Sequence, residues 1–205
     1  LATLLVGLAL ATALWSAVQA LNAEARQSYD RAAGRLGLSG YDALVRPGEP
    51  LGVADFVTLR RAGWLVSPVL EGRLPVGAGT PVTVVGLDML SAPPGALPAG
   101  LSGLGEGDSP ALLFTAPGLA FAAPGLVERL GARGLGQDGP ELRADAAVPP
   151  GQLITDIGVA ERLLGREGEI DRLLVLPDQP QGRPPLDAVA PGLVRETATE
   201  AGEIA

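Results

Sequence analysis

The first twenty residues form an uncharged, apolar stretch that runs without a break into a polar segment. Residues 1–20 contain no acidic or basic side chain, and the first ionisable residue is Glu24. A helix rises about 1.5 Å per residue, so twenty residues match the roughly 30 Å hydrocarbon core of a bilayer. Apolar positions then continue at helical spacing, with charged residues between them: Leu21, Ala25, Ala32 and Leu36. The pattern predicts a transmembrane helix over 1–21, incomplete at its start, and a stalk helix over 22–36.

The same stretch has a second interpretation, as a cleaved signal peptide. An apolar region followed by small residues is typical of such a leader, and cleavage after Ala20 would leave a mature chain that begins near Leu21. The helical pattern does not stop at Ala20, however, and this continuity favours the transmembrane helix.

After the stalk, short segments of strand and helix patterns alternate. Alternating or β-branched apolar residues, bounded by Gly and Pro, predict strands over 41–46, 64–73, 80–88, 111–115, 141–148, 170–176 and 193–197. Helices are predicted over 53–61, 123–131 and 156–164, the last with Asp156 as N-cap and Gly165 as its end. Residues 91–108 and 177–185 are rich in turn residues and are expected to be loops. The chain is therefore expected to be a mixed α/β protein.

Composition removes most kinds of catalytic site. The 205 residues include no His, no Cys and no Lys, since all fifteen basic residues are Arg. Zinc sites built on His or Cys, Ser-His-Asp and Cys-His catalysis, and phosphate-binding or Schiff-base lysines are therefore excluded. The net charge is −8, which disfavours nucleic acid and anionic lipid headgroups as partners. No catalytic, cofactor-binding or metal-binding residue is predicted.

Two local patterns are weak candidates for a phosphate-binding or calcium-binding site. The Gly-rich stretch 100–107 (GLSGLGEG) does not follow a strand and open a helix, so a flexible loop is favoured over a phosphate-binding loop. The acidic residues of 161–171 do not have the spacing of an EF-hand, and Arg162, Arg166 and Arg172 alternate with them. A surface of mixed charge is favoured over a calcium site.

Several stretches, in this order, resemble MacB/FtsX/LolC-type ABC transporter permeases. The hydrophobic helix that runs into VQALNAEARQSY is similar to their first membrane helix and stalk. SPVLEGR followed by VTVVGLD resembles a strand pair of their extracytoplasmic domain, and PGLVERLG resembles a short helix that follows a central strand there. DIGVAERLLG followed by IDRLLV resembles the helix and strand late in that domain. Each motif alone is unspecific, and their order carries the resemblance.

The resemblance implies an α+β architecture: a membrane helix and stalk leading into a two-lobed extracytoplasmic domain with short helices on small sheets. A core lobe would comprise 37–90 and 170–205, and an inserted lobe 91–169. Such permeases have four membrane helices per unit, so the chain is expected to continue past Ala205 into a second one. The domain would lie on the periplasmic side of a bacterial inner membrane and would not itself be an enzyme.

The resemblance also implies partners. A cytoplasmic ABC ATPase, separate or fused, would bind the ATP, so no cofactor is expected in this chain. A second permease copy or a homologous permease would complete a dimer. A periplasmic partner protein, or a lipoprotein or peptide substrate, would receive the movement that the domain transmits. In this scheme the domain couples ATP-driven movement of membrane helices to transport or mechanical work outside the membrane.

Two other functions remain open from the residues. The first is a secreted or periplasmic binding module whose leader is cleaved, which predicts a mature N-terminus close to Leu21. The second is a membrane-anchored hydrolase that uses Asp and Glu alone. It predicts a deep pocket in which two carboxylates converge and have shifted pKa values.

The predicted stalk provides a first test of the coupling scheme. A stalk continuous with a membrane helix would move with it as one rigid lever. Ala25→Pro should break that lever, since proline in a helix interior costs about 3 kcal/mol. We expect transport to be uncoupled from ATP hydrolysis while the domain remains folded, as measured by transport and hydrolysis rates in the same membranes. Retained coupling in this variant would exclude the lever.

Overall fold

The computed structural model describes residues 38, 40–76, 81–103, 109–131, 134–136 and 138–198. The predicted transmembrane helix (1–21) and stalk (22–36) lie outside these residues. Within the described ranges, no helix has the length and apolarity needed to cross a membrane. The transmembrane helix and the stalk therefore stay predictions from the sequence.

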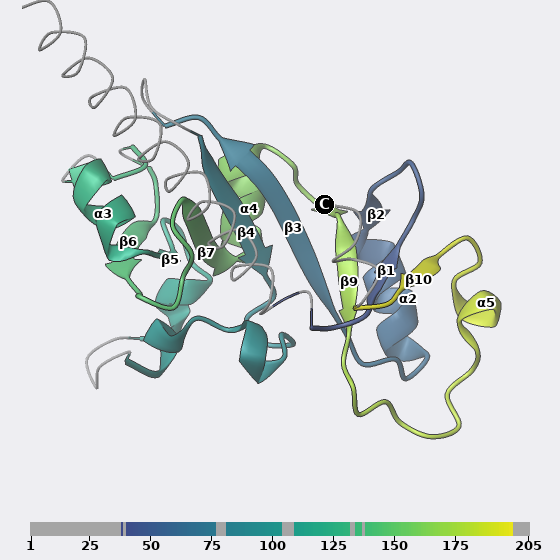
Figure 1. Ribbon diagram of the computed structural model, residues 1–205. Coiled ribbons are helices and arrows are strands. Elements are labelled where there is room, and N and C mark those ends of the chain that lie inside the picture. Colours follow the sequence, from purple (N-terminus) through teal and green to yellow (C-terminus); the bar gives the residue numbers. More distant parts are fainter. Residues whose placement is uncertain are drawn as a thin grey trace, which may run out of the picture.

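One large sheet organises the described chain (Figure 1). Its eight strands, in spatial order, are β10 (Val194–Glu196), β1 (Ala43–Val45), β9 (Arg172–Val175), β3 (Val66–Leu74), β4 (Val82–Leu87), β7 (Gln152–Asp156), β5 (Leu119–Ala122) and β6 (Glu141–Ala144). A separate two-stranded sheet joins β2 (Leu51–Gly52) to β8 (Glu169–Ile170). The α+β class is confirmed, but the expectation of small sheets is wrong, because most strands belong to one sheet.

Short helices cover this sheet. The α-helices are α2 (Val53–Arg61), α3 (Pro124–Leu130), α4 (Ile157–Leu164) and α5 (Leu186–Val189). Three 3₁₀ turns lie between β4 and β5: η1 (Pro94–Ala96), η2 (Ala99–Gly103) and η3 (Pro110–Leu113). Figure 1 shows α3 beside β5 and β6 at one end of the sheet, and α2 and α5 at the other end.

Two groups of strands meet within the large sheet where β4 pairs with β7. This pairing is parallel, with Thr83 opposite Gln152 and Leu87 opposite Asp156. The strands on the β7 side (β5, β6 and β7) all come from 91–169, whereas those on the other side come from 37–90 and 170–198. The sheet is continuous across this junction, and the division into a core lobe and an inserted lobe stays a prediction.

The predicted helices are confirmed, including their caps. Helix α2 covers the predicted residues, and α4 begins after Asp156, whose Oδ1 accepts a hydrogen bond from the N–H of Gly158 at 3.0 Å. Gly165 ends α4 in the left-handed conformation (φ 65°), which glycine adopts at little cost. Local capping chemistry was thus enough to place these elements.

The strand expected over 111–115 is wrong. Ser109 and Pro110 start a 3₁₀ turn there: the Ser109 hydroxyl accepts from the N–H of Ala111 at 3.3 Å, and proline is suited to the first helical position. The strand of this region is β5, residues 119–122, which the sequence pattern missed. Its sequence LAFA is completely buried and Ala-rich, so it shows neither alternation nor β-branched residues.

The strand predicted over 170–176 is divided at Asp171. Ile170 belongs to β8 and pairs with Leu51 of β2, whereas β9 begins at Arg172 and pairs with β1 and β3. At the division, the Asp171 carboxylate accepts a hydrogen bond from the N–H of Glu71 at 2.6 Å. The Asp171 side chain takes the place of a backbone ladder hydrogen bond here. The chain therefore leaves the β2–β8 sheet and enters the large sheet at this residue.

Trp64 is a core residue. It is 4% exposed and packs with Leu44, Leu59 and Leu173 beneath α2. Its indole N–H donates to the carbonyl of Pro184 at 3.1 Å, and the Arg183 guanidinium lies 4.4 Å from the ring centre. Gln179 also bonds to the backbone of Leu65, so the loop 177–185 is attached to the core through Trp64 and through this amide.

Helix α4 can pack closely against the sheet because a glycine of β4 faces the helix. A Cβ atom at Gly86 would meet the Cβ of Ala160 closer than real Cβ atoms approach, and would lie 3.2 Å from the Cα of Ile157. Both neighbours are backbone or directly attached to it, so neither can rotate away. Helix α4 and strand β4 therefore pack at a separation that only glycine at position 86 permits.

We expect Gly86→Ala to lower the free energy of unfolding by about 1–3 kcal/mol, the usual cost of overpacking a core. Chemical denaturation monitored by circular dichroism measures the change. Gly125→Ala in α3 is the matched control, since a Cβ there meets nothing within 4 Å. Its stability should be unchanged or slightly raised, because alanine has the better helix propensity. Equal stability of the two variants would contradict the close packing of α4.

Candidate functional site

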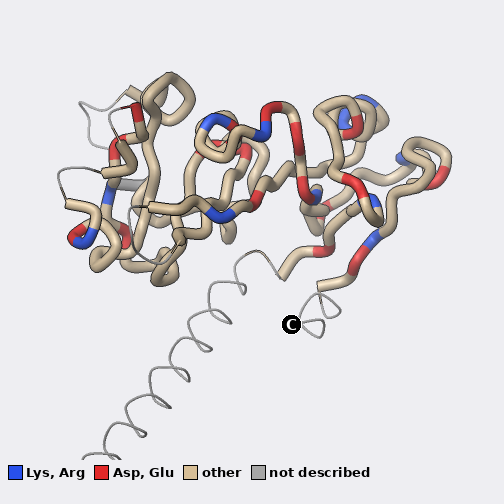
Figure 2. The backbone as a smooth tube through the Cα atoms, turned by 90° about the horizontal axis from the view of Figure 1, so that it is seen from above, with Lys and Arg blue, Asp and Glu red and all other residues tan. Residues whose placement is uncertain are grey.

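The described chain begins and ends on neighbouring strands. Strands β1 and β10 pair in antiparallel fashion, with Ala43 opposite Glu196 and Val45 opposite Val194. The chain enters β1 at the Ala43 end, and it leaves β10 at Glu196, directly across the pair. Figure 2 shows these first and last described segments side by side. Any segments that precede and follow them therefore start from one point of the domain.

Asp42 connects the first and last described segments of the chain by hydrogen bonds. Its Oδ1 accepts from the N–H of Ala198 at 3.0 Å, and its Oδ2 accepts from Nε and Nη2 of Arg195 at 2.8 and 2.6 Å. The hydrogen bond from Ala198, reinforced by Arg195 and opposed by partial burial, holds the pKa of Asp42 below its ordinary value. The carbonyl of Asp42 also accepts from the N–H of Val175 at 2.7 Å, which connects this junction to β9.

A second polar cluster lies at the turn between α4 and β8, beside β3 and β9. Arg166 Nε donates to Glu169 at 2.7 Å, Nη2 donates to Asp171 at 2.6 Å, and Nη1 donates to the Glu71 carbonyl at 3.0 Å. These bonds, with Asp171 first, raise the pKa of Arg166 above its ordinary value. Arg172 pairs in turn with the Glu71 side chain. One guanidinium thus ties β3 to the turn between α4 and β8.

This cluster contains most of the acidic residues that were considered for calcium. Glu169 and Asp171 bind Arg166, and Glu161 accepts from the N–H of Gly168 at 3.1 Å. Over the described residues, no group of three or more potential ligands could hold a metal ion. Guanidinium and backbone N–H groups are the partners of these carboxylates in the structure. Of the Gly-rich stretch 100–107, residues 100–103 belong to η2 and residues 104–107 lie outside the described residues.

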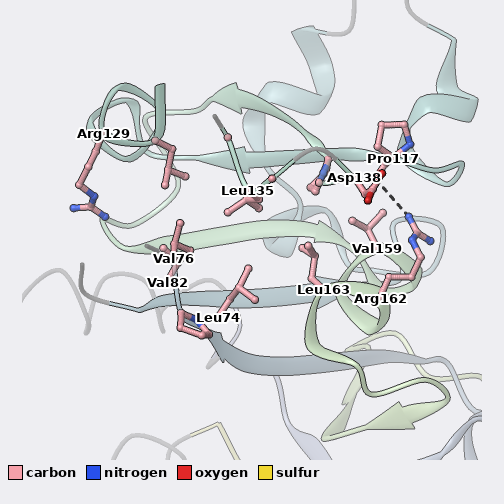
Figure 3. A pocket seen from close by; sticks show the side chains of 16 residues that line it. Leu74, Val76, Val82, Pro117, Arg129, Leu135, Asp138, Val159, Arg162 and Leu163 are labelled. Atoms are coloured by element: carbon pink, nitrogen blue, oxygen red, sulfur yellow. Dashed lines mark hydrogen bonds between the residues drawn. The ribbon is translucent and has the colours of Figure 1, made fainter. Parts of the chain in front are cut away.

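A pocket of about 1030 Å³ lies between α3, α4 and the ends of β3 and β4. Aliphatic residues form the largest group among the described lining residues: Leu74, Val76, Val82, Leu130, Leu135, Val159 and Leu163. Prolines and glycines form the next group: Pro75, Pro117, Gly134, Gly136, Gly139 and Pro140. Three charged residues complete the lining, namely Arg129, Asp138 and Arg162. Figure 3 shows Arg129 at one end and Arg162 with Asp138 at the other, with aliphatic side chains between them.

The pocket does not have the arrangement that an Asp/Glu hydrolase requires. Such an enzyme needs two carboxylates that converge on one bond, 5–10 Å apart by the general rule for glycosidases. Among the described lining residues, Asp138 is the one carboxylate, and its neighbour at that end is a guanidinium. The sequence assigned no role to this pocket, because its residues come from four separate segments.

Comparisons with known proteins show a similarity of fold but no similarity of sequence. No protein-family model matches the chain, and no curated protein sequence matches it. Among solved structures, the fold is similar to that of the periplasmic region of MacB from Actinobacillus actinomycetemcomitans. The two are 10% identical, with a TM-score of 0.48, and the match covers 83% of this chain and 94% of that one.

The junction at Asp42 predicts a defined dependence on pH. Because its pKa is lower in the folded than in the unfolded state, the carboxylate stabilises the fold above the unfolded pKa of about 3.9. This stabilisation disappears as the pH falls through the folded pKa. We expect Asp42→Asn to lower the free energy of unfolding at pH 7 by about 0.5–1 kcal/mol, as for a partly exposed pair.

The difference between Asp42→Asn and the parent chain should then shrink below about pH 4, where the parent also loses the charge. Urea unfolding at several pH values measures it. Asp178→Asn, in the exposed loop 177–185, is the control and should leave the pH profile unchanged. A difference at Asp42 that is independent of pH would show that the charge does not hold the two ends together.

Proposed function

We propose that this chain is the extracytoplasmic domain of an ABC transporter permease subunit. The observation that carries the proposal is the antiparallel pairing of β1 with β10, which places the entry and exit of the domain side by side. A domain inserted between two consecutive membrane helices needs this geometry, because both helices have to reach the bilayer from one side of it. The ordered motifs that resemble MacB/FtsX/LolC-type permeases, behind a predicted transmembrane helix, agree with this arrangement.

The structure suggests how such a domain could transmit movement. A displacement of the segments flanking β1 and β10 acts on both strands at once, since Asp42 binds Arg195 and Ala198. From β1 it passes through the hydrogen-bonded ladder to β9 and β3, and Arg166 ties β3 to the turn after α4. Because these contacts are backbone ladders and charge-assisted bonds, the domain can move as a stiff body.

In this proposal the chain works with partners rather than alone. An ABC ATPase on the cytoplasmic side binds and hydrolyses ATP, and a second permease subunit completes the membrane unit. The domain lies on the periplasmic side of the inner membrane and performs transport or mechanical work there, on a periplasmic protein, a lipoprotein or a peptide. No catalytic residue is assigned to the chain itself.

A cleaved, secreted binding module is the competing function. A secreted module could have the same pairing of β1 with β10. The pairing would have no function there, because a free domain has no membrane helices to connect. The two functions differ in the mature N-terminus, which lies near Leu21 for a secreted module and at an intact apolar helix for a permease. The hydrolase alternative lacks support from the pocket, which has a single carboxylate.

The decisive experiment uses the absence of cysteine in this sequence. Leu90 is 82% exposed, so Leu90→Cys provides one reactive thiol on the domain surface. We expect a maleimide that cannot cross the inner membrane to label this variant in intact cells expressing the full gene product. Val84→Cys, at a completely buried position, is the control and should react only after denaturation.

The same tagged gene product should be purified from membranes in mild detergent. We expect an ABC ATPase with ATP hydrolysis activity to accompany it. Labelling of Leu90→Cys only after lysis would exclude the extracytoplasmic location. Labelling in intact cells, together with a mature N-terminus near Leu21 and no associated ATPase, would instead identify a secreted module.

A further inference from the structure

We propose that the pocket between α3, α4 and the ends of β3 and β4 binds a single long acyl chain that carries one negative charge, as in a fatty acid. This inference goes beyond the coupling function, because it rests on the side chains around the pocket and not on what the domain transmits. A volume of about 1030 Å³ is at the upper end of the range for small-molecule sites.

The pocket walls leave apolar surface for a ligand to cover. Leu74, Val76, Leu130, Leu135 and Leu163 pack against the buried cluster around α4, yet each remains only partly buried. They line the pocket from β3, α3 and α4 and from the turn after α3. Removing this surface from water is favourable in proportion to its area, and an aliphatic ligand would bury it.

The same walls discriminate against peptides and aromatic ligands. Three lining residues, Pro75, Pro117 and Pro140, have no backbone N–H, and most of the other side chains are aliphatic. Fewer backbone N–H groups are therefore present to pair with the carbonyls of a peptide, and each buried group left unpaired costs free energy. The described lining residues include no aromatic side chain on which a ring could stack. A hydrocarbon chain needs neither amide partners nor stacking.

The charged end of the pocket defines the headgroup. Arg162 Nη1 donates to the Gly158 carbonyl at 3.0 Å and Nη2 to the Pro117 carbonyl at 3.5 Å, which orients the guanidinium (Figure 3). Arg162 forms no ion pair within the described part of the chain, so its charge is available to an anion. The carboxylate of Asp138 lies at the same end and repels every negative charge there, so the repulsion grows with the charge of the headgroup. One carboxylate therefore fits better than a dianionic phosphate.

The other end of the pocket is consistent with an elongated ligand. Arg129 lies there, exposed and without an ion pair among the described residues, and the aliphatic walls run between it and Arg162. Arginine covers apolar surface with its methylene groups while its charge stays in water. The methyl end of an acyl chain could thus lie under the Arg129 stem, with the carboxylate at Arg162.

A photoreactive 16-carbon fatty acid with a mid-chain diazirine tests the proposal. The full chain is reconstituted in nanodiscs of zwitterionic phospholipid, illuminated with the probe and digested, and the adducts are mapped by mass spectrometry. We expect adducts on α4 and on residues 134–136, and competition by unlabelled palmitate. Hexadecanol, which lacks the charge, should compete about tenfold less well, the ratio expected when one charge-assisted hydrogen bond is lost.

Two variants separate the headgroup from the chain. Arg162→Gln should reduce labelling about tenfold for the same reason, whereas Arg61→Gln, at an exposed position on the distant helix α2, should leave it unchanged. Leu163→Trp should fill the pocket and abolish the adducts while the circular dichroism spectrum stays that of the parent.

Four results would overturn the proposal: equal competition by hexadecanol, stronger competition by the lysophosphatidate of the same chain length or by an apolar peptide, adducts spread over other surfaces, and full labelling of Leu163→Trp. None of these results depends on the ATPase or on the location of the domain. Failure here is therefore distinguishable from failure of the transporter proposal.

Discussion

The parallel pairing of β4 with β7 is the contact on which the rest of the structure depends. It joins strands separated by more than sixty residues and turns two groups of strands into one sheet. Strands β5 and β6 belong to the large sheet through this ladder, since β5 pairs with β7 and β6 pairs with β5. A parallel ladder has to be buried on both faces, and α4 covers one of them.

Helix α4 can cover the sheet closely because small residues meet there. Gly86 on β4 faces Ala160 on α4, and Gly72 on β3 faces Leu164. The same helix then presents Val159, Leu163 and Arg162 to the pocket on its other side. The packing of α4 on the sheet and the shape of the pocket are therefore consequences of one helix position.

Polar contacts are concentrated at the places where the chain changes direction. Asp42 holds the first and last strands together, and Asp171 replaces a backbone ladder bond where β8 gives way to β9. Arg166 connects that bend to β3. Each of these charged groups has hydrogen-bond partners, which compensate for the free-energy cost of its partial burial. These contacts fix the conformation of the chain at the bends. A domain of this kind has stiff elements and defined joints, which suits the transmission of movement from its paired ends.

The sequence by itself determined the elements whose signals are local. The helix at 53–61, the helix after Asp156 with its glycine end, and the strand pair before and after residues 77–80 follow from capping residues, glycines and β-branched runs within a few positions. Composition alone removed histidine, cysteine and lysine chemistry.

Only the tertiary structure decided how these elements combine. The strand β5 was missed and a strand at 111–115 was wrongly expected, because Ala-rich buried strands carry no period and a Ser-Pro start favours a turn. The division at Asp171 depends on a partner a hundred residues away. The pocket, the joined ends at Asp42 and the single sheet all require contacts between distant segments. Local patterns encode the backbone preference of each segment, whereas these features depend on which segments share a ladder or a core, and that is settled by packing.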